Sequence, residues 1–213
     1  MNNYNISYAI TTHNEDESLS KLLKVIEEYK DDSDEIIVVD DYSTNQLTLD
    51  ILSTYKNVYR RRFNKNYADQ KNFLNSKCKN EYIFQFDADE FPSILLIKNI
   101  KNIIRKTKAE LIAIPRSNIV SDVTPNIIKK WKWKVDRYKR LNYPDYQGRV
   151  YANKEHIKWT RPLHEYIIGF NSLHKIPQDT NMDIIHNKSL LRQLESNSRY
   201  YNNYNNDGSI REN

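Results

Sequence analysis

The apolar residues in the first half of the chain alternate between two patterns: short continuous runs, and residues spaced three or four apart. The run at residues 35–39, which is β-branched at each position after Glu35, is typical of a strand buried on both faces. By contrast, Leu19, Leu22, Leu23 and Ile26 recur at the spacing of one helix face, behind a polar start at residues 14–16. The pattern predicts strands at residues 6–11, 35–39, 58–60, 82–86 and 111–114, separated by helices that end near Ile26 and that span about 46–55, 69–79 and 92–106.

This order of elements indicates an α/β fold with a mostly parallel sheet and helices on both faces. In such sheets, ligands bind beyond the carboxyl ends of the strands. Dense polar groups follow three of the predicted strands, at residues 11–15, 40–44 and 87–90. Because these three ends converge on one edge of the sheet, we predict a binding site there.

Beyond residue 115 the chain becomes aromatic, basic and irregular. The pattern predicts short mixed strands around residues 149–151 and 165–168, a strand at 182–185 and a final helix at about 189–204. We therefore expect a single domain with two halves, residues 1–115 and 116–213, the second being a smaller mixed region completed by the C-terminal helix.

Composition restricts the kind of nucleotide site that can be built. Only 3 of the 213 residues are glycine, whereas a dinucleotide fingerprint or a P-loop needs clustered glycines to wrap a phosphate with backbone N–H groups. A nucleotide must therefore be held in another way. The lone Cys78 excludes an intrachain disulfide and a cysteine-based zinc site.

Charge and hydropathy indicate a soluble, intracellular protein, located in the cytoplasm. The N-terminus carries no basic and apolar signal region, and no apolar run approaches the roughly 18 residues of a transmembrane segment. Lys and Arg number 33 against 28 Asp and Glu, which gives a net charge of +5. This excess is too small to indicate a polyanionic partner by itself.

Asp87 and Asp89 flank a single alanine directly after a buried strand. Two carboxylates this close repel each other unless a cation or a proton lies between them. Oxygen ligands at this spacing suit Mg²⁺ or Mn²⁺, which commonly bridges to a substrate diphosphate. A solvated acidic turn before a helix is the other interpretation, and these two residues alone do not decide between them.

Four motifs in the first half resemble the nucleotide-sugar half of family 2 glycosyltransferases, which have the Rossmann-like GT-A fold. The matching pieces are Thr11-Thr12-His13-Asn14-Glu15, Val38-Val39-Asp40-Asp41-Tyr42-Ser43, Gln70-Lys71-Asn72 and Asp87-Ala88-Asp89-Glu90. The second half is similar to a subgroup that includes lipopolysaccharide-core glucosyltransferases, through Arg149-Val150-Tyr151, Ile157-Lys158-Trp159, Leu163-His164-Glu165 and Asp183-Ile184-Ile185-His186. The resemblance covers roughly residues 5–204, apart from about 116–147.

The resemblance implies roles for individual residues. The nucleotide-sugar pocket would include Thr11, His13, Asn14, Glu15, Asp40, Asp41, Lys71, Asp87 and His164, with Asp41 accepting from the base N–H. Lys71 stands where the family usually has arginine, so it could offset phosphate charge without bidentate geometry. Asp87 would contact the ribose or the metal, Asp89 would bind the metal directly, and His186 would complete the metal or diphosphate site. A hydrogen-bonded histidine at a strand end is the other interpretation of His186.

Glu165 is the candidate catalytic base. An inverting transfer needs one carboxylate to take the proton of the acceptor hydroxyl as its oxygen attacks the anomeric carbon. The alternative is a glutamate paired with Arg161 or His164, and pairing does not exclude catalysis.

Residues 129–140 are the remaining conspicuous segment, with a basic sequence that holds Trp131 and Trp133. The alternation predicts an edge strand with the tryptophans and Val135 on one face and lysines on the other, which discourage pairing. An acceptor platform, with aromatic rings stacking on sugars or bases, is the functional alternative.

The sequence thus predicts a metal-dependent, inverting glycosyltransferase. It would use Mn²⁺ or Mg²⁺ and a nucleotide-diphosphate sugar, most simply UDP-linked, with a glycan or lipopolysaccharide-type saccharide as acceptor. Two alternatives stay open at this point: a nucleotidyltransferase of related fold, and a basic, Trp-rich module that binds nucleic acid. A glycosyltransferase that acts on modified DNA would combine features of both classes.

Overall fold

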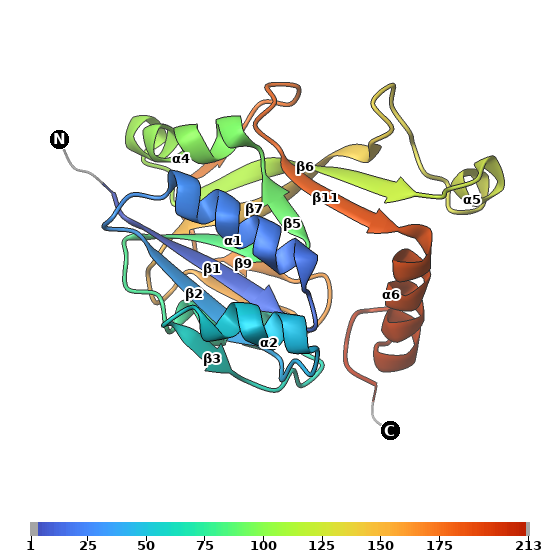
Figure 1. Ribbon diagram of the computed structural model, residues 1–213. Helices are drawn as coiled ribbons and strands as arrows, with labels where there is room; N and C mark the ends of the chain where they lie inside the picture. Colours follow the sequence, from blue (N-terminus) through green and yellow to red (C-terminus); the bar gives the residue numbers. More distant parts are fainter. Residues whose placement is uncertain (1–3, 212–213) are drawn as a thin grey trace.

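The computed structural model describes residues 4–211 and has a mixed α/β architecture (Figure 1). The elements in chain order are β1 (Ile6–Thr12), α1 (Glu17–Tyr29), β2 (Glu35–Asp40), α2 (Gln46–Ser53), β3 (Val58–Arg60), α3 (Tyr67–Asn75), β4 (Tyr82–Asp87), β5 (Glu90–Pro92), α4 (Ile94–Thr107), β6 (Leu111–Ser121), α5 (Pro125–Lys130), β7 (Leu141–Ala152), β8 (Lys158–Thr160), β9 (Tyr166–Ile168), β10 (Leu173–Lys175), β11 (Ile184–Ser189) and α6 (Leu190–Asn203). The strands and helices predicted for the first half are therefore present, with ends that differ by a few residues.

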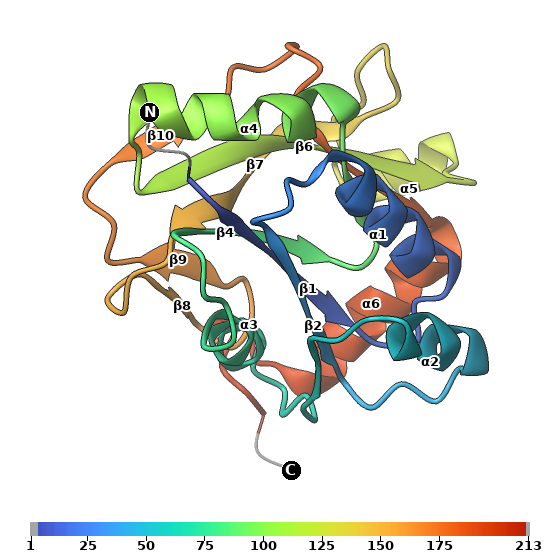
Figure 2. The ribbon, with the colours of Figure 1, turned by 60° about the vertical axis from the view of Figure 1, so that its left-hand side comes forward.

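The first half forms the parallel part of the sheet. Strands β3, β2, β1 and β4 lie side by side in that order and run parallel. Helix α1 contacts α2 and α4 on one face, and α3 packs with β8 on the other (Figure 2). Burial on both faces explains why these strands are continuous apolar runs rather than alternating ones. The prediction of a mostly parallel sheet between helices is confirmed.

The second half adds mixed strands to the same sheet. Strand β7 pairs antiparallel with both β4 and β6. Beyond β6, β11 runs parallel to it, and β5 pairs antiparallel with β11 at the edge. Helix α6 follows β11 directly and stands beside the sheet (Figure 1). The nine-stranded sheet is therefore continuous through both halves.

Strand register brings the predicted polar strand ends together. Thr11 lies opposite Asp87, and Thr12 lies opposite Asp40. The chain leaves β4 at Asp87 and turns at once into β5, so Asp89 is held in a two-residue connection between them. The carboxyl edge of the parallel strands is thus the place where the acidic residues of the first half meet.

The prediction that Pro92 opens a helix is wrong. Pro92 closes β5 and lies opposite Ile184 of β11. Helix α4 begins two residues later, after Ser93, whose side chain accepts a hydrogen bond from the Leu96 N–H. An edge strand tolerates proline because the missing N–H is not needed for pairing there.

The predicted strand with Trp131, Trp133 and Val135 on one face is also wrong. Thr124 caps a short helix in which Pro125 is the first residue, and Trp131 ends it. After this helix, Val135 makes only an isolated bridge to Leu141. A capping threonine followed by proline is a helix-start signal, and it decides the local structure over the alternation that follows it.

Within residues 4–211, none of the helices combines the length and the hydrophobicity that a membrane span requires.

Candidate active site

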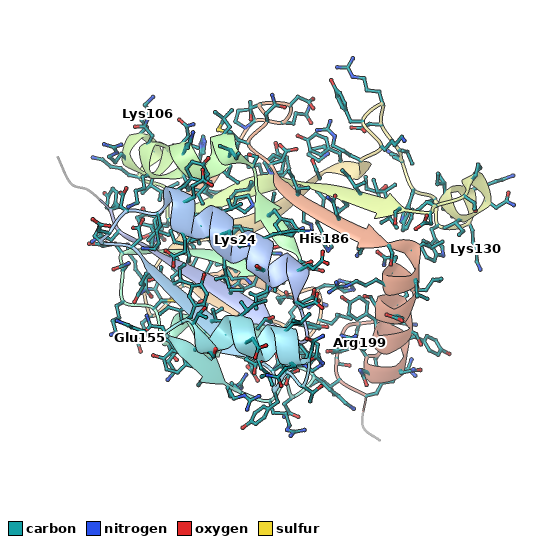
Figure 3. All side chains as sticks on the ribbon, viewed as in Figure 1. Lys24, Lys106, Lys130, Glu155, His186 and Arg199 are labelled. Atoms are coloured by element: carbon teal, nitrogen blue, oxygen red, sulfur yellow. The ribbon has the colours of Figure 1, made fainter. Side chains whose placement is uncertain are left out.

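A cavity of about 740 Å³ opens at the carboxyl ends of β1, β2 and β4 and is bounded on its other side by α6. His186 on β11 and Arg199 on α6, both labelled in Figure 3, line this cavity. Ten of the predicted site residues line the cavity: Thr11, His13, Asn14, Glu15, Asp41, Lys71, Asp87, Asp89, His164 and His186. The other two are not lining residues: Asp40 is fully buried, and Glu165 keeps 16% of its side chain exposed beside the lining residue Lys71.

The Asp87 carboxylate is bound by protein groups on both oxygens. Its Oδ1 accepts from the Thr11 hydroxyl at 2.9 Å, and its Oδ2 accepts from Arg149 at 3.0 Å. Lys71 Nζ lies 3.5 Å from Oδ1. Burial by itself raises the pKa of Asp87, but the charges of Lys71 and Arg149 outweigh it and hold this pKa well below its usual value. Asp87 is therefore a firmly ionised group.

Asp89 faces His186 across the edge of the cavity, with Oδ2 at 3.2 Å from Nε2. Burial by itself raises the pKa of Asp89, but the hydrogen bond and charge of His186 outweigh this effect, so the pKa lies below its usual value. The other ring nitrogen of His186, Nδ1, lies 2.9 Å from the side-chain oxygen of Asn118. With Nδ1 donating to the Asn118 oxygen, Nε2 is the nitrogen that could bind a metal ion in place of the proton it shares with Asp89.

The pair of Asp89 and His186 fits one divalent cation. Two ligands about 2.1 Å from one ion and at right angles are about 3 Å apart, which matches the observed spacing. Within residues 4–211, no group of three or more acidic, histidine or cysteine side chains is arranged to hold a metal. The remaining ligands would therefore have to come from water and substrate, as is usual for Mg²⁺ at phosphate sites.

Glu165 is held by Lys71. The Lys71 ammonium donates to Glu165 Oε1 at 2.6 Å and lies 4.5 Å from the centre of the Trp159 ring. Only 3% of the Lys71 side chain is exposed, so it links the carboxylates of Glu165 and Asp87 in a water-poor environment. The expected partners were different: Arg161, for example, donates to the backbone of Asp207 instead.

At the end of the cavity near β2, the carboxylate of Asp41 accepts a backbone hydrogen bond on one of its two oxygens. Asp41 Oδ1 accepts from the Phe63 N–H at 2.7 Å, and Oδ2 lies 3.8 Å from His13 Nδ1. Asp40 is fully buried and accepts from Arg60 at 3.1 Å and from the Ser43 N–H at 3.0 Å. Asp40 therefore supports the loop after β2 from behind, while Asp41 is the acid that faces the cavity.

Comparison with protein families identifies this architecture. The family model "Glycosyl transferase family 2" matches residues 7–157, which is most of the chain. The chain belongs to glycosyl transferase family 2. The prediction of this family is confirmed, and family membership favours a glycosyltransferase over the nucleotidyltransferase and the non-catalytic nucleic-acid-binding module. Similarity to the lipopolysaccharide-core subgroup stays a prediction.

Solved structures of similar fold come from Staphylococcus aureus. TarS residues 1–349 in complex with UDP-GlcNAc superpose with a TM-score of 0.59 and 15% identity, over 86% of this chain and 58% of that chain. TarS 1–349 in complex with UDP gives a TM-score of 0.57 and 13% identity, over 86% and 60%. The family 2 glycosyltransferase described here thus spans about three fifths of these structures, and the likeness confirms the GT-A fold. A search of curated protein sequences gives no match.

The glycosyltransferase contains a buried ionic network that the sequence did not reveal. Arg149, only 2% exposed, donates to Asp87 at 3.0 Å, to Glu90 at 2.5 Å and to Gln85. Glu90 in turn accepts from Arg116 at 2.8 Å. The one available signal was a lone arginine at the start of the apolar run of β7, where a charge needs a partner.

Replacing Arg149 with methionine is expected to lower the free energy of unfolding by about 3–5 kcal/mol, because Glu90 and Asp87 would be left without their shared counter-charge. Urea unfolding followed by circular dichroism measures the loss. Lys21→Met is the control, since it removes an exposed pair with Glu17 and should leave the midpoint unchanged. A loss no larger than that of the control would contradict this role of Arg149.

Helix α6 contributes basic residues that were also missed. Arg192 and Arg199, seven residues apart and so on one helix face, both line the cavity. Arg192 Nη1 donates to Glu15 at 3.0 Å, and its Nη2 lies 3.5 Å from Asp89. Lys188, just before the helix, also lines the cavity, and its pKa is lowered by burial. The spacing of the arginines along the predicted final helix could have identified this face.

Proposed function

We propose that this enzyme transfers a sugar from a UDP-linked nucleotide-diphosphate sugar to a saccharide hydroxyl, with inversion at the anomeric carbon and with Mn²⁺ or Mg²⁺. The observation that carries the proposal is the distribution of charge along one cavity. Asp41 lies at one end, while Asp89, His186 and the cations of α6 lie at the other. The TarS structures that contain UDP-GlcNAc and UDP support this class of donor.

The nucleotide would bind at the end near β1 and β2. Asp41 Oδ2 is the acceptor for a base N–H, since Phe63 already donates to Oδ1. Asn14 fixes the adjoining loop, because its side-chain oxygen accepts from the Thr44 N–H at 2.7 Å and from the Asn45 N–H at 2.9 Å. In this arrangement the Asp87 carboxylate accepts from a ribose hydroxyl, as its place between Lys71 and Arg149 leaves it poorly disposed to bind a metal.

The diphosphate would lie against Asp89, His186 and α6. A divalent cation held by Asp89 and His186 would stabilise the departing diphosphate as a Lewis acid. Arg192 and Lys188 add positive charge on the same side of the cavity, and Arg192 can exchange Glu15 for a phosphate oxygen, which is an equally good acceptor for its guanidinium.

Glu165 would act as the base. Its Oε1 is fixed by Lys71, which leaves Oε2 to accept the proton of the attacking hydroxyl. Lys71 is a positioning residue here, because it orients Glu165 and at the same time contacts Asp87. A single base beside a good leaving group supports inversion, since no covalent glycosyl-enzyme intermediate is needed.

A panel of nucleotide sugars with and without Mn²⁺ or Mg²⁺ tests this function by thermal shift. One UDP-sugar at about a hundredfold excess over its Kd is expected to raise Tm by about 5–10 °C, and only with metal present. The same sugar should be hydrolysed slowly in the absence of an acceptor. Equal shifts with and without metal would contradict the metal dependence, and shifts with nucleoside triphosphates alone would contradict the donor class.

A further inference from the structure

The positive net charge of the protein comes from one segment that projects from the body of the molecule. Residues 122–140, which connect β6 to β7 and which we term the basic knob, contain seven lysines and arginines and two aspartates. Their net charge of +5 equals that of the whole chain, so the rest of the sequence is electrically balanced. Helix α5 within the knob lies away from the body of the molecule, and Lys130 is at its end (Figures 1 and 3).

Most of this charge is free of internal partners. Arg140 anchors the base of the knob by pairing with Asp136 at 2.6 Å and with Asp179 at 2.8 Å. The other six cations, Lys129, Lys130, Lys132, Lys134, Arg137 and Lys139, form no ion pair with any residue in the range 4–211 and are exposed. The knob therefore presents a local positive potential that the balanced remainder does not offset.

Apolar and aromatic groups lie between these cations. Trp131 and Trp133 pack edge to face with their ring centres 4.6 Å apart, and Val135 and Tyr138 are exposed beyond them. None of the residues of the knob is buried. The knob thus combines exposed cations with large apolar side chains that have no core to enter.

A second apolar surface begins at the same end of the sheet. Ser121, where β6 leads into the knob, lies opposite Ser189, where β11 leads into α6. On α6, Leu194 is 46% and Tyr201 is 73% exposed. Their seven-residue spacing puts them on one face, opposite the face that carries Arg192 to the cavity. This outer face of α6 therefore starts from the same end of the sheet as the knob and turns away from the cavity.

We propose that the basic knob and the outer face of α6 bind the surface of an anionic lipid bilayer. Lysines near such a surface each contribute about 1 kcal/mol of attraction, or about fivefold in affinity. Tryptophan, tyrosine and leucine side chains add to this by entering the interface. A soluble polyanion would use the lysines, but it would gain nothing from Leu194 or Val135. This inference does not rest on the proposed donor or metal.

Sedimentation of the full chain with vesicles tests the proposal. Binding is expected to vesicles of phosphatidylcholine with phosphatidylglycerol and not to phosphatidylcholine alone. Replacing Lys129, Lys130, Lys132 and Lys134 together with glutamine should weaken binding at least about 100-fold. The matched control replaces Lys24, Lys56, Lys79 and Lys106 with glutamine. These lysines are also exposed, so the control loses the same charge outside the knob. It should bind almost as well as the wild type.

A second variant separates lipid from other polyanions. Leu194→Asn combined with Tyr201→Asn should weaken vesicle binding about tenfold and leave binding to heparin unchanged. Three results would overturn the proposal: no binding of the wild type to anionic vesicles, an equal loss in the two lysine variants, or binding to heparin with none to vesicles.

Discussion

Replacing Asp89 with alanine is expected to reduce turnover of the sugar donor by at least about 1000-fold, which corresponds to the several kcal/mol that a metal contributes at a leaving diphosphate. Asp89 is ionised at neutral pH, because the hydrogen bond and charge of His186 hold its pKa below the usual value despite burial. The substitution also removes the second ligand beside His186 Nε2. Hydrolysis of the nucleotide sugar, measured at saturating donor, gives the rate.

Metal removal distinguishes this assignment from a loss of fold. EDTA should reduce the wild type to about the rate of the Asp89 variant and should leave the variant itself unaffected. Asp32→Ala is the control, since Asp32 is exposed in the turn before β2 and should keep full activity. Unchanged turnover in Asp89→Ala would show that Asp89 does not hold the metal.

Glu165→Gln is expected to leave donor binding intact while transfer falls by about 100- to 10 000-fold, the range for loss of a general base. Glutamine keeps an oxygen that can accept from Lys71, so the contact at 2.6 Å can persist while the capacity to take a proton is lost. Donor affinity from the thermal shift and product formation with an acceptor separate the two effects.

Glu155→Gln provides the same chemical change on an exposed loop (Figure 3) and should have no effect on either measurement. If Glu165→Gln retains transfer, Glu165 is not the base, and its role is limited to binding Lys71. In that case Lys71→Met should still lower donor affinity, since the same lysine contacts Asp87.

The sequence predicted the donor half because its signals are local. The apolar runs of β1, β2 and β4 each end in polar residues, and parallel pairing necessarily gathers those ends at one edge. Ten of the predicted site residues consequently line one cavity.

Long-range pairing accounts for what the sequence did not reveal. Glu90 and Pro92 form a strand only because β11 lies beside them, and β11 comes from about a hundred residues later in the chain. Likewise, Arg149 meets Glu90 and Asp87 only through the insertion of β7 beside β4. No periodicity within a short window contains such information.

Tyr42 and Lys65 are two of the non-glycine residues near the site whose backbone is left-handed. Tyr42 adopts a left-handed conformation with φ of 48°, and its ring lies beneath Arg60 and Arg62. In the loop before α3, the left-handed residue is Lys65 with φ of 54°, and Asn66 instead caps the helix. Asn66 itself has an extended backbone, and its side chain accepts a hydrogen bond from the Asp69 N–H, which stabilises the start of the helix.

Strand β7 belongs to the second half in sequence, yet it supplies the backbone partner of β4 in the first and of β6 beyond it. Separating the halves at residue 115 would leave β4 with an open, apolar edge, the kind of surface that pairs with other chains and aggregates. We therefore expect neither half to fold without the other. We also expect the connections on either side of β7 to tolerate insertions and substitutions that β7 itself does not, since the strand is shared by both halves.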